Sequence, residues 1–335
     1  MMFKSINYNY NYNYNKHIIR LINLIIISIV LASCTYDKQD LPVNKPPITQ
    51  SPIVPIDTTS LNFFIISDWG YNGFIDQMRV KWEMNKIAKI IKLRYILTCG
   101  DNFQNVGVTS VNDPLWQLNY VNVYNDSSLL VPWYPALGNH DYMSNPDAQV
   151  QYSSINNYWN MPARYYTYVK QVDSNTYARY IVLDTYDLIT KYQSLADTTK
   201  YDTIAQYVWL KNILSDLKEK WVFVYGHHPM FSASLVHGDT KELKIMVKPL
   251  FDAYNVDFYI CGHDHDFEHA RESNRGTDYI VTGTGGTVRP IGYDDKTIFS
   301  LSALGFTYIS LTADKAKLYF ITADNKIEYS YVRNK

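Results

Sequence analysis

The sequence predicts one large α/β domain in which helices and buried β-sheets form stacked layers. Apolar runs of strand length alternate with segments whose apolar residues recur at helical spacing, which is typical of helices packed on a sheet. The chain has 335 residues, of which 47% are hydrophobic, so it can bury a substantial core and is too apolar to be disordered.

The charge of the chain is balanced, because 31 basic residues stand against 32 acidic ones. A nucleic-acid clamp draws its affinity from clustered Lys and Arg side chains that neutralise phosphates. We therefore expect no nucleic-acid partner.

Residues 1–34 form a predicted signal peptide. Basic residues up to Arg20 precede an uncharged apolar run, Leu21 to Leu31, which is too short to span about 30 Å of hydrocarbon as a stable helix. The closing Leu31-Ala32-Ser33-Cys34 resembles the bacterial lipoprotein signal, in which the Cys becomes the lipidated first residue. This resemblance implies a lipid anchor on Cys34 as the only membrane contact, and a place at the bacterial cell envelope, facing the periplasm or the outer surface. An ordinary signal peptide with an incidental Cys34 is the alternative.

Residues 35–60 are a predicted tether, and residues 61–335 are the predicted folded domain. The tether has five prolines among polar residues and no periodicity. The domain retains only Cys99 and Cys261, too few for a disulfide framework. Each ends an apolar run, so buried free thiols are favoured over a bridge.

Six apolar runs are the predicted strands of the first part of the domain. They are Leu61–Ser67, Tyr95–Cys99, Trp133–Leu137, Tyr180–Leu183, Trp221–Tyr225 and Val256–Cys261. After Tyr279 the pattern changes to three runs separated by polar turns, which predicts an antiparallel meander that completes a sheet. These runs are Phe306–Leu311, Lys317–Ile321 and Ile327–Tyr331.

Apolar stripes at helical spacing predict three helices between the strands. The stripes are Val80-Met84-Ile87-Ile91, Tyr207-Leu210-Leu214-Leu217 and Leu243-Val247-Leu250-Tyr254. The third stripe contains Pro249, so its helix must start late or bend there.

Polar residues stand where five of the predicted strands end. The five ends are Ser67-Asp68-Trp69-Gly70, Gly100-Asp101-Asn102, Gly138-Asn139-His140-Asp141, Gly226-His227-His228-Pro229 and Gly262-His263-Asp264-His265. Ligand sites of α/β sheets form at the carboxyl ends of strands, where loops converge. A single Asp-x-Gly is more often a turn, but the ordered set offers three oxygen donors and three imidazoles without a thiolate cage. Such a set suits one or two ions such as iron, zinc or manganese.

On these motifs the sequence resembles the calcineurin-like metallophosphoesterases and, within them, the small purple acid phosphatases of the tartrate-resistant type. The matching stretch runs from about Leu61 to about Gly286. The resemblance implies a four-layer αββα sandwich with two mixed β-sheets and two metal ions between the carboxyl ends of the sheets.

The resemblance also implies a role for each motif residue. Asp68 and His265 would hold the first metal, Asn139, His227 and His263 the second, and Asp101 would bridge both. His140 would meet the substrate phosphate and the leaving group, and His237 would be a second substrate-side imidazole. Asp141 would either orient His140 or serve as a structural turn residue. His228, His269 and Arg271 are expected to be surface or packing residues.

Gln104 is a departure from this family. Purple acid phosphatases have, three residues after the bridging Asp, a Tyr whose phenolate binds ferric iron and gives the colour. Gln104 offers a neutral amide oxygen, a poorer partner for a trivalent ion. We expect the first site to lose its colour and to favour a divalent ion, to leave a coordination position to water, or to bind metal weakly. The two ions would be iron, zinc or manganese.

The resemblance implies hydrolysis of phosphate monoesters by a metal-activated water, with a small phosphate ester or a phosphopeptide as substrate and a monomeric protein. Two alternatives remain. The chain could be a phosphodiesterase or nucleotide pyrophosphatase of the same fold, since pocket walls set that choice. It could also be a non-catalytic binding or scaffold module, which the loss of one ligand at Gln104 mildly favours.

Overall fold

The computed structural model describes residues 58–189, 203–272 and 276–335. The predicted signal peptide, 1–34, and nearly all of the predicted tether, 35–60, lie outside these residues. Within the described part of the chain, no helix is both long and apolar enough to cross a bilayer.

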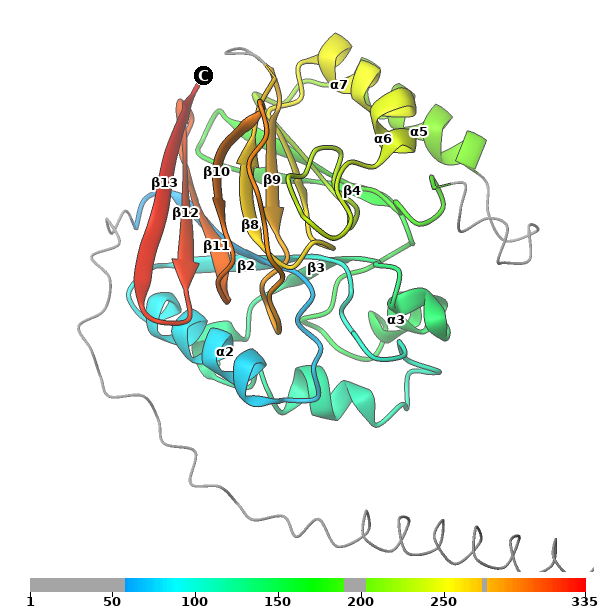
Figure 1. The fold of residues 1–335 in the computed structure, drawn as a ribbon, viewed down its shortest axis with the longest axis vertical. Helices are drawn as coiled ribbons and strands as arrows, with labels where there is room; N and C mark the ends of the chain where they lie inside the picture. The colour runs from blue at the N-terminus through cyan, green and yellow to red at the C-terminus, as the bar shows by residue number, and fades with distance from the viewer. Residues whose placement is uncertain (1–57, 190–202, 273–275) are drawn as a thin grey trace, which may run out of the picture. The chain divides into compact units, whose positions relative to one another are not determined.

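A six-stranded mixed sheet contains the first three strands and the C-terminal meander (Figure 1). β1, β2 and β3 run parallel to one another, whereas β11 pairs with β1 in antiparallel fashion and is followed by β12 and β13. In sheet order the strands are β13 (Lys326–Asn334), β12 (Lys315–Thr322), β11 (Gly305–Leu311), β1 (Leu61–Ile66), β2 (Leu93–Cys99) and β3 (Trp133–Ala136). The predicted meander is confirmed.

A seven-stranded mixed sheet forms the second layer of strands. Its central strands β5, β6, β7 and β9 are parallel, and β4, β8 and β10 are antiparallel to their neighbours. In sheet order the strands are β10 (Thr297–Leu301), β8 (Phe267–Ala270), β9 (Asp278–Thr282), β7 (Phe258–Cys261), β6 (Trp221–Tyr225), β5 (Tyr177–Val182) and β4 (Tyr166–Gln171).

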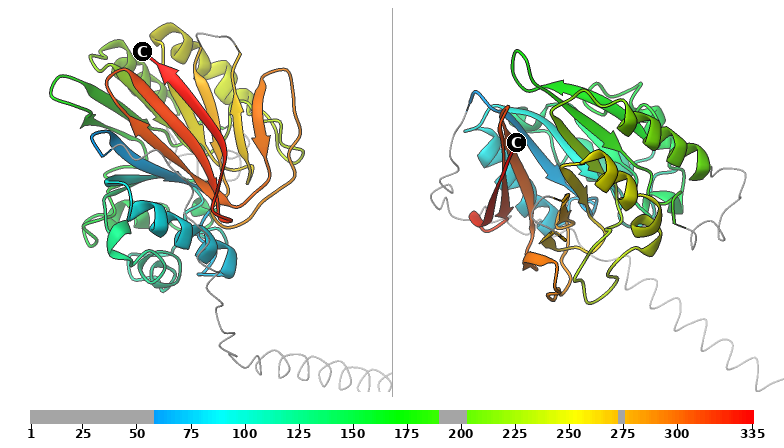
Figure 2. Two further views of the ribbon diagram at one scale, coloured as in Figure 1. Left: turned by 90° about the vertical axis from the view of Figure 1, so that its left-hand side faces the viewer. Right: turned by 90° about the horizontal axis from the view of Figure 1, so that it is seen from above.

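Helices cover the outer faces of the two sheets, as the two views of Figure 2 show. α2 (Ile75–Ala88) packs on the six-stranded sheet, and α3 (Asp147–Tyr152) lies on the same side of the molecule (Figure 1). α5 (Thr203–Ser215), α6 (Lys241–Met246) and α7 (Lys248–Tyr254) cover the seven-stranded sheet. The order helix, sheet, sheet, helix confirms the four-layer αββα prediction.

The layer between the sheets is largely aromatic. Phe63 of β1 stacks on Tyr95 of β2 at a ring-centroid distance of 4.9 Å. Its other neighbours, Tyr180 and Phe223, belong to the opposite sheet and meet it edge to face at 5.8 and 5.7 Å. Every residue of β1 is buried, which explains why both faces of this strand are apolar except at Asn62, whose Oδ1 accepts a hydrogen bond from the Tyr308 hydroxyl at 2.8 Å.

The third predicted helix is divided in two at Val247. α6 ends at Met246, and α7 begins at Lys248 with Pro249 in its first turn. Backbone N–H groups in the first turn of a helix have no intrahelical acceptor, so the N–H that proline lacks is not needed there. The prediction that Pro249 requires a bend or a late start is thus confirmed.

β4, β8, β9 and β10 are strands that the sequence did not predict. β9 is fully buried, but it is short and begins with the charged Asp278. β4 and β10 are edge strands with partly exposed residues, so polar residues interrupt their apolar ones. β8 is fully buried but contains Glu268 and His269, two residue types that rarely mark a buried strand.

An ion-pair network joins β13 of one sheet to the other sheet. Asp278 of β9 accepts a hydrogen bond from Nη1 of Arg333 at 2.8 Å, and also binds His269 Nε2 at 2.8 Å and Arg271 Nε at 2.6 Å. Burial opposes the charge on Asp278, but His269 and Arg333 outweigh it and hold the pKa of the carboxyl below its usual value. His269 and Arg271 are therefore packing residues, as expected.

Candidate metal centre

Both sheets contribute to one polar site. Asp68, Asp101 and Asn139 follow β1, β2 and β3 of the six-stranded sheet, whereas the histidines follow β6 and β7 of the seven-stranded sheet. His227 follows β6, and His263 and His265 follow β7. Because the strands within each set are parallel, their carboxyl ends meet at one edge, and the sandwich brings the two edges face to face.

Four of these residues have left-handed backbone conformations. The φ angles are 55° for Asp68, 47° for Asp101, 73° for His263 and 56° for His265. Such angles are uncommon for residues other than glycine and cost free energy, so they persist where the surrounding structure holds them for function.

Gly100 leaves room for the histidine from the opposite sheet. Its φ is 92°, and an added Cβ would lie 2.8 Å from Nδ1 of His227 and 2.7 Å from the backbone nitrogen of Gly138. A side chain at this position would push the two halves of the site apart.

The predicted ligands of the first metal lie together. Oδ1 of Asp68 is 3.3 Å from Nε2 of His265, and both side chains are buried. Gln104 lies beside them, with its amide nitrogen 3.5 Å from the same Nε2.

The predicted ligands of the second metal form a neighbouring group. Nε2 of His227 lies 3.1 Å from Oδ1 of Asn139 and 3.2 Å from Nδ1 of His263. The backbone carbonyl of Cys99 accepts a hydrogen bond from Nδ1 of His227 at 2.9 Å, so the neutral ring presents an unprotonated Nε2 to the group.

Asp101 stands where the two groups meet. Its Oδ2 is 3.3 Å from Nε2 of His227, and atoms of Asp68, Asp101 and His227 lie within 4.8 Å of one another. Its Oδ1 accepts a hydrogen bond from the backbone nitrogen of His140 at 2.8 Å, which fixes the carboxylate orientation. This is the position that a bridging carboxylate requires.

The acids of the site control its electrostatics. Burial alone would lower the pKa of His227, but Asp101 and Asp68 raise it to about 9. Burial opposes ionisation of Asp68, yet His265 and His227 lower its pKa below the usual value. The carboxylates therefore attract positive charge strongly, and a metal ion would compete with the imidazole proton.

The donor set fits two metal ions. Oδ1 of Asp68 and Oε1 of Gln104 are buried without a hydrogen-bond partner, which is costly unless a cation accepts their lone pairs. Two ligands about 2.0–2.2 Å from one ion lie roughly 3.0–3.4 Å apart, and the donor pairs of the site are 3.1 to 3.3 Å apart.

Comparisons with known proteins agree with this geometry. Residues 61–267 match the model of the family described as calcineurin-like phosphoesterase. The chain belongs to this family. Purple acid phosphatase 17 of Arabidopsis thaliana is 31% identical over 292 residues, which cover 82% of this chain and 85% of the relative. The tartrate-resistant acid phosphatase type 5 of Homo sapiens is 30% identical over 80% of this chain and 89% of its own.

A solved structure is also similar. GAP50, the anchor in the inner membrane complex of Plasmodium, aligns with a TM-score of 0.75 at 25% identity, over 82% of this chain and 89% of that one. The relatives named as acid phosphatases and the family fold identify this calcineurin-like phosphoesterase as a hydrolase with a dinuclear metal centre.

His140 lies at the open side of this centre. Its Nε2 is 3.9 Å from Oδ2 of Asp101, and 25% of its side chain is exposed. The ring is therefore close enough to meet a group bound at the metals and open enough to contact a substrate.

Asp141 has a different environment from His140. It is completely buried, and its carboxylate accepts hydrogen bonds from the backbone nitrogens of Gly138 at 2.8 Å, Phe103 at 3.1 Å and Asn102 at 3.2 Å. Of the two interpretations, this arrangement favours the structural one, because Asp141 ties the loop after β3 to the loop after β2. An orienting contact with His140 is not among the hydrogen bonds that the structure gives Asp141.

His237 reaches the site from the loop before α6. Its ring stacks on that of His263, with centroids 4.4 Å apart. Arg289, a residue that the sequence analysis missed, donates a hydrogen bond from Nη1 to Nε2 of His237 at 2.7 Å. No motif marks Arg289, and its place depends on the loop that follows β9.

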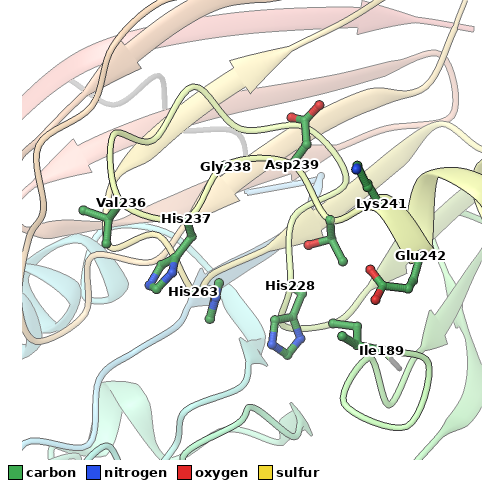
Figure 3. A pocket seen from close by; sticks show the side chains of 10 residues that line it. Ile189, His228, Val236, His237, Gly238, Asp239, Lys241, Glu242 and His263 are labelled. Atoms are coloured by element: carbon green, nitrogen blue, oxygen red, sulfur yellow. The ribbon is translucent and has the colours of Figure 1, made fainter. Parts of the chain in front are cut away.

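A pocket of about 270 Å³ opens beside the centre (Figure 3). His263 forms one wall, and the side chains around it are mostly polar. The lining residues are Ile189, His228, Val236, His237, Gly238, Asp239, Thr240, Lys241, Glu242 and His263. His228 also lines the pocket, and it is buried with Nδ1 2.8 Å from the Thr185 hydroxyl oxygen, so of the two expectations it is a packing and not a surface residue.

Proposed function

We propose that this phosphoesterase hydrolyses phosphate monoesters, as acid phosphatases do. The observation that supports this most strongly is the single cluster of six donors from Asp68, Asp101, Asn139, His227, His263 and His265, with His140 on its open side. The similar proteins named as acid phosphatases support the same substrate chemistry.

Asp101 and His140 have different roles in the proposed hydrolysis. When bound, two metal ions neutralise the phosphate charge and lower the pKa of a water molecule. Asp101 holds its place between the two ligand groups through its hydrogen bond from the His140 backbone. The His140 side chain donates a proton or a charged hydrogen bond to the leaving oxygen.

Divalent iron, zinc or manganese are the ions that suit this site. Gln104 is buried next to His265 and offers only a neutral amide where ferric iron would gain from an anionic oxygen. The first site therefore has one negative charge fewer than a site with a phenolate.

The substrate reaches the site from outside the cell in this proposal. The lipid anchor on Cys34 and the tether 35–60 would hold a monomeric domain at the bacterial envelope, where it acts on a small phosphate ester or a phosphopeptide too charged to cross a membrane.

The scaffold alternative rests on two observations. Gln104 removes one anionic ligand, and the similar structure of GAP50 belongs to a protein described as an anchor. A phosphodiesterase or nucleotide pyrophosphatase remains the alternative within the enzyme class.

The test is a metal analysis of the purified protein together with rates on an aryl monoester, an alkyl monoester, a diester and a nucleotide. We expect about two metals per chain and the highest kcat/KM on monoesters. Asp101→Asn is the matched control, since it preserves the side-chain size but should remove both metal and turnover. Preferred cleavage of the diester or nucleotide would establish the enzymatic alternative, and bound metal without hydrolysis of any ester would establish the scaffold.

A further inference from the structure

Arg289 makes three hydrogen bonds to the metal centre. Its backbone nitrogen donates to the carbonyl of His265 at 2.9 Å. Its Nη1 donates to the carbonyl of His263 at 3.0 Å and to Nε2 of His237 at 2.7 Å. Arg289 thus binds the backbone of His263 and His265, which follow β7, and the side chain of His237, which stacks on His263.

These contacts leave one edge of the guanidinium available. Nη1 has two hydrogens, and the bonds to His263 and His237 use both. Nε and Nη2 have three more donors, for which the described residues provide no acceptor, and Arg289 forms no ion pair with a carboxylate of that part of the chain. Arg289 is only partly buried beside the centre.

The edge is held in a fixed orientation. A guanidinium only donates hydrogen bonds, so Nε2 of His237 is an acceptor and the ring proton of the neutral form lies on Nδ1. The stack of His237 on His263 and the hydrogen bonds from Nη1 hold the side chains of Arg289 and His237 against the loop after β7, which supplies the predicted metal ligand His263. Little side-chain freedom is left to lose when a ligand binds.

We propose that the Nε–Nη2 edge of Arg289 is an oxyanion-binding subsite for the substrate. The two parallel N–H groups of a guanidinium edge match two oxygens of a phosphate or carboxylate. The oxyanion is either the reacting phosphate or a second acidic group of the ester, and both have the same chemistry. The inference rests on the proposed function, because the subsite takes its substrate from the adjacent metal centre.

The first experiment measures binding of inorganic phosphate to the metal-loaded protein by calorimetry. Loss of a charged bidentate contact should raise the Kd of phosphate about tenfold or more in Arg289→Met. Arg289→Lys keeps the charge but not the fork, so its Kd should lie between those of Arg289→Met and wild type. Arg94→Met removes an exposed arginine at the amino end of β2 and should bind phosphate as wild type does.

The second experiment separates the two sources of the oxyanion. It compares kcat/KM on 2-phosphoglycolate, which has a carboxylate, with kcat/KM on 2-hydroxyethyl phosphate, which has none. If Arg289 binds the reacting phosphate, Arg289→Met should lose the same factor on both esters. If it binds a second acidic group, the loss should be confined to 2-phosphoglycolate.

Metal content is measured for every variant, and phosphate affinities are compared at equal occupancy. The subsite is refuted if Arg289→Met binds phosphate as tightly as wild type and also loses no kcat/KM on 2-phosphoglycolate, or if its whole loss of affinity follows a loss of metal that Arg289→Lys restores. Calorimetry needs no turnover, so a wild-type protein that cleaved neither ester would contradict the proposed function and not the subsite.

Discussion

The amide nitrogen of Gln104 lies 3.5 Å from Nε2 of His265, inside the group that we assign to the first metal. Both side chains are buried, and Oε1 of Gln104 has no hydrogen-bond partner. The residue three positions after Asp101 therefore faces the metal site even though it is no longer a tyrosine.

The first prediction concerns colour. The iron-loaded wild-type protein should lack a visible charge-transfer band, because Gln104 supplies no phenolate. Gln104→Tyr should create such a band and shift the preference toward ferric iron. Visible absorption spectra of both proteins, with iron content determined in parallel, measure this. An intense band in the wild-type protein would show that another residue supplies the phenolate.

The second prediction concerns His140. Its Nε2 lies 3.9 Å from Asp101 at the open side of the site, so His140→Ala should retain the metals and lose turnover. General acid catalysis is worth roughly 10²–10⁴-fold, and the loss should be largest on an alkyl phosphate, whose leaving group is strongly basic. An aryl phosphate, which departs without a proton, should show a smaller loss. Equal losses with metals retained would indicate substrate binding instead.

The third prediction concerns stability. Asp278→Asn leaves the cations of Arg271 and Arg333 without their shared buried carboxylate, so the free energy of unfolding should fall by about 3–5 kcal/mol. Asp252→Asn is the control, because Asp252 is half-exposed and pairs with Lys248 on the surface of α7, where such a pair contributes little. Denaturant unfolding of the three proteins at pH 7 gives these values.

The pH dependence of the same residue has a definite sign. The pKa of Asp278 is lowered in the folded protein, with burial opposed by His269 and Arg333. Its stabilisation is therefore complete above about pH 4, the unfolded value, and is lost as the pH falls from there through the folded pKa. The difference in free energy of unfolding between wild type and Asp278→Asn should therefore be constant above about pH 4 and shrink as the pH falls below it. A difference that stayed constant below about pH 4 as well would mean that the carboxylate charge is not the cause.

The fourth prediction concerns the anchor. Mature protein should begin at Cys34 with acyl chains and sediment with membranes. Cys34→Ser should release or misprocess the protein, and mass spectrometry of the N-terminal peptide measures the modification. A wild-type mature form found wholly in the soluble fraction, without lipid mass, would contradict the anchor.

The strands that end in polar motifs could be predicted because they are buried on both faces. β1, β6 and β7 are buried along their full length, so the chain shows apolar runs, broken only by Asn62 in β1, that end just before Asp68, His227 and His263. The change from apolar strand residues to polar, ligand-type residues thus falls at the strand end. That coincidence is visible in the sequence alone.

Other parts of the molecule depend on partners far away in the sequence. Glu268 in β8 is buried because its carboxylate accepts the backbone N–H of Ala233, 35 residues earlier. Arg289 acquires its place from hydrogen bonds to His263 and His237, which only the folded loops bring within reach. Secondary-structure propensity depends on neighbouring residues in the sequence, so it does not predict such long-range contacts.

The division of the centre between the two sheets has a consequence for assembly. One sheet holds the oxygen donors of Asp68, Asp101 and Asn139, and the other holds the imidazoles of His227, His263 and His265. Each sheet by itself offers half a coordination shell, so tight capture of an ion requires the sandwich to be closed. Ions bound by ligands from both sheets would link the two sheets. Because they bind only the closed sandwich tightly, they would stabilise it relative to any state in which the layers separate. Removal of the ions by a chelator should therefore lower the free energy of unfolding of the whole domain as well as abolish its activity.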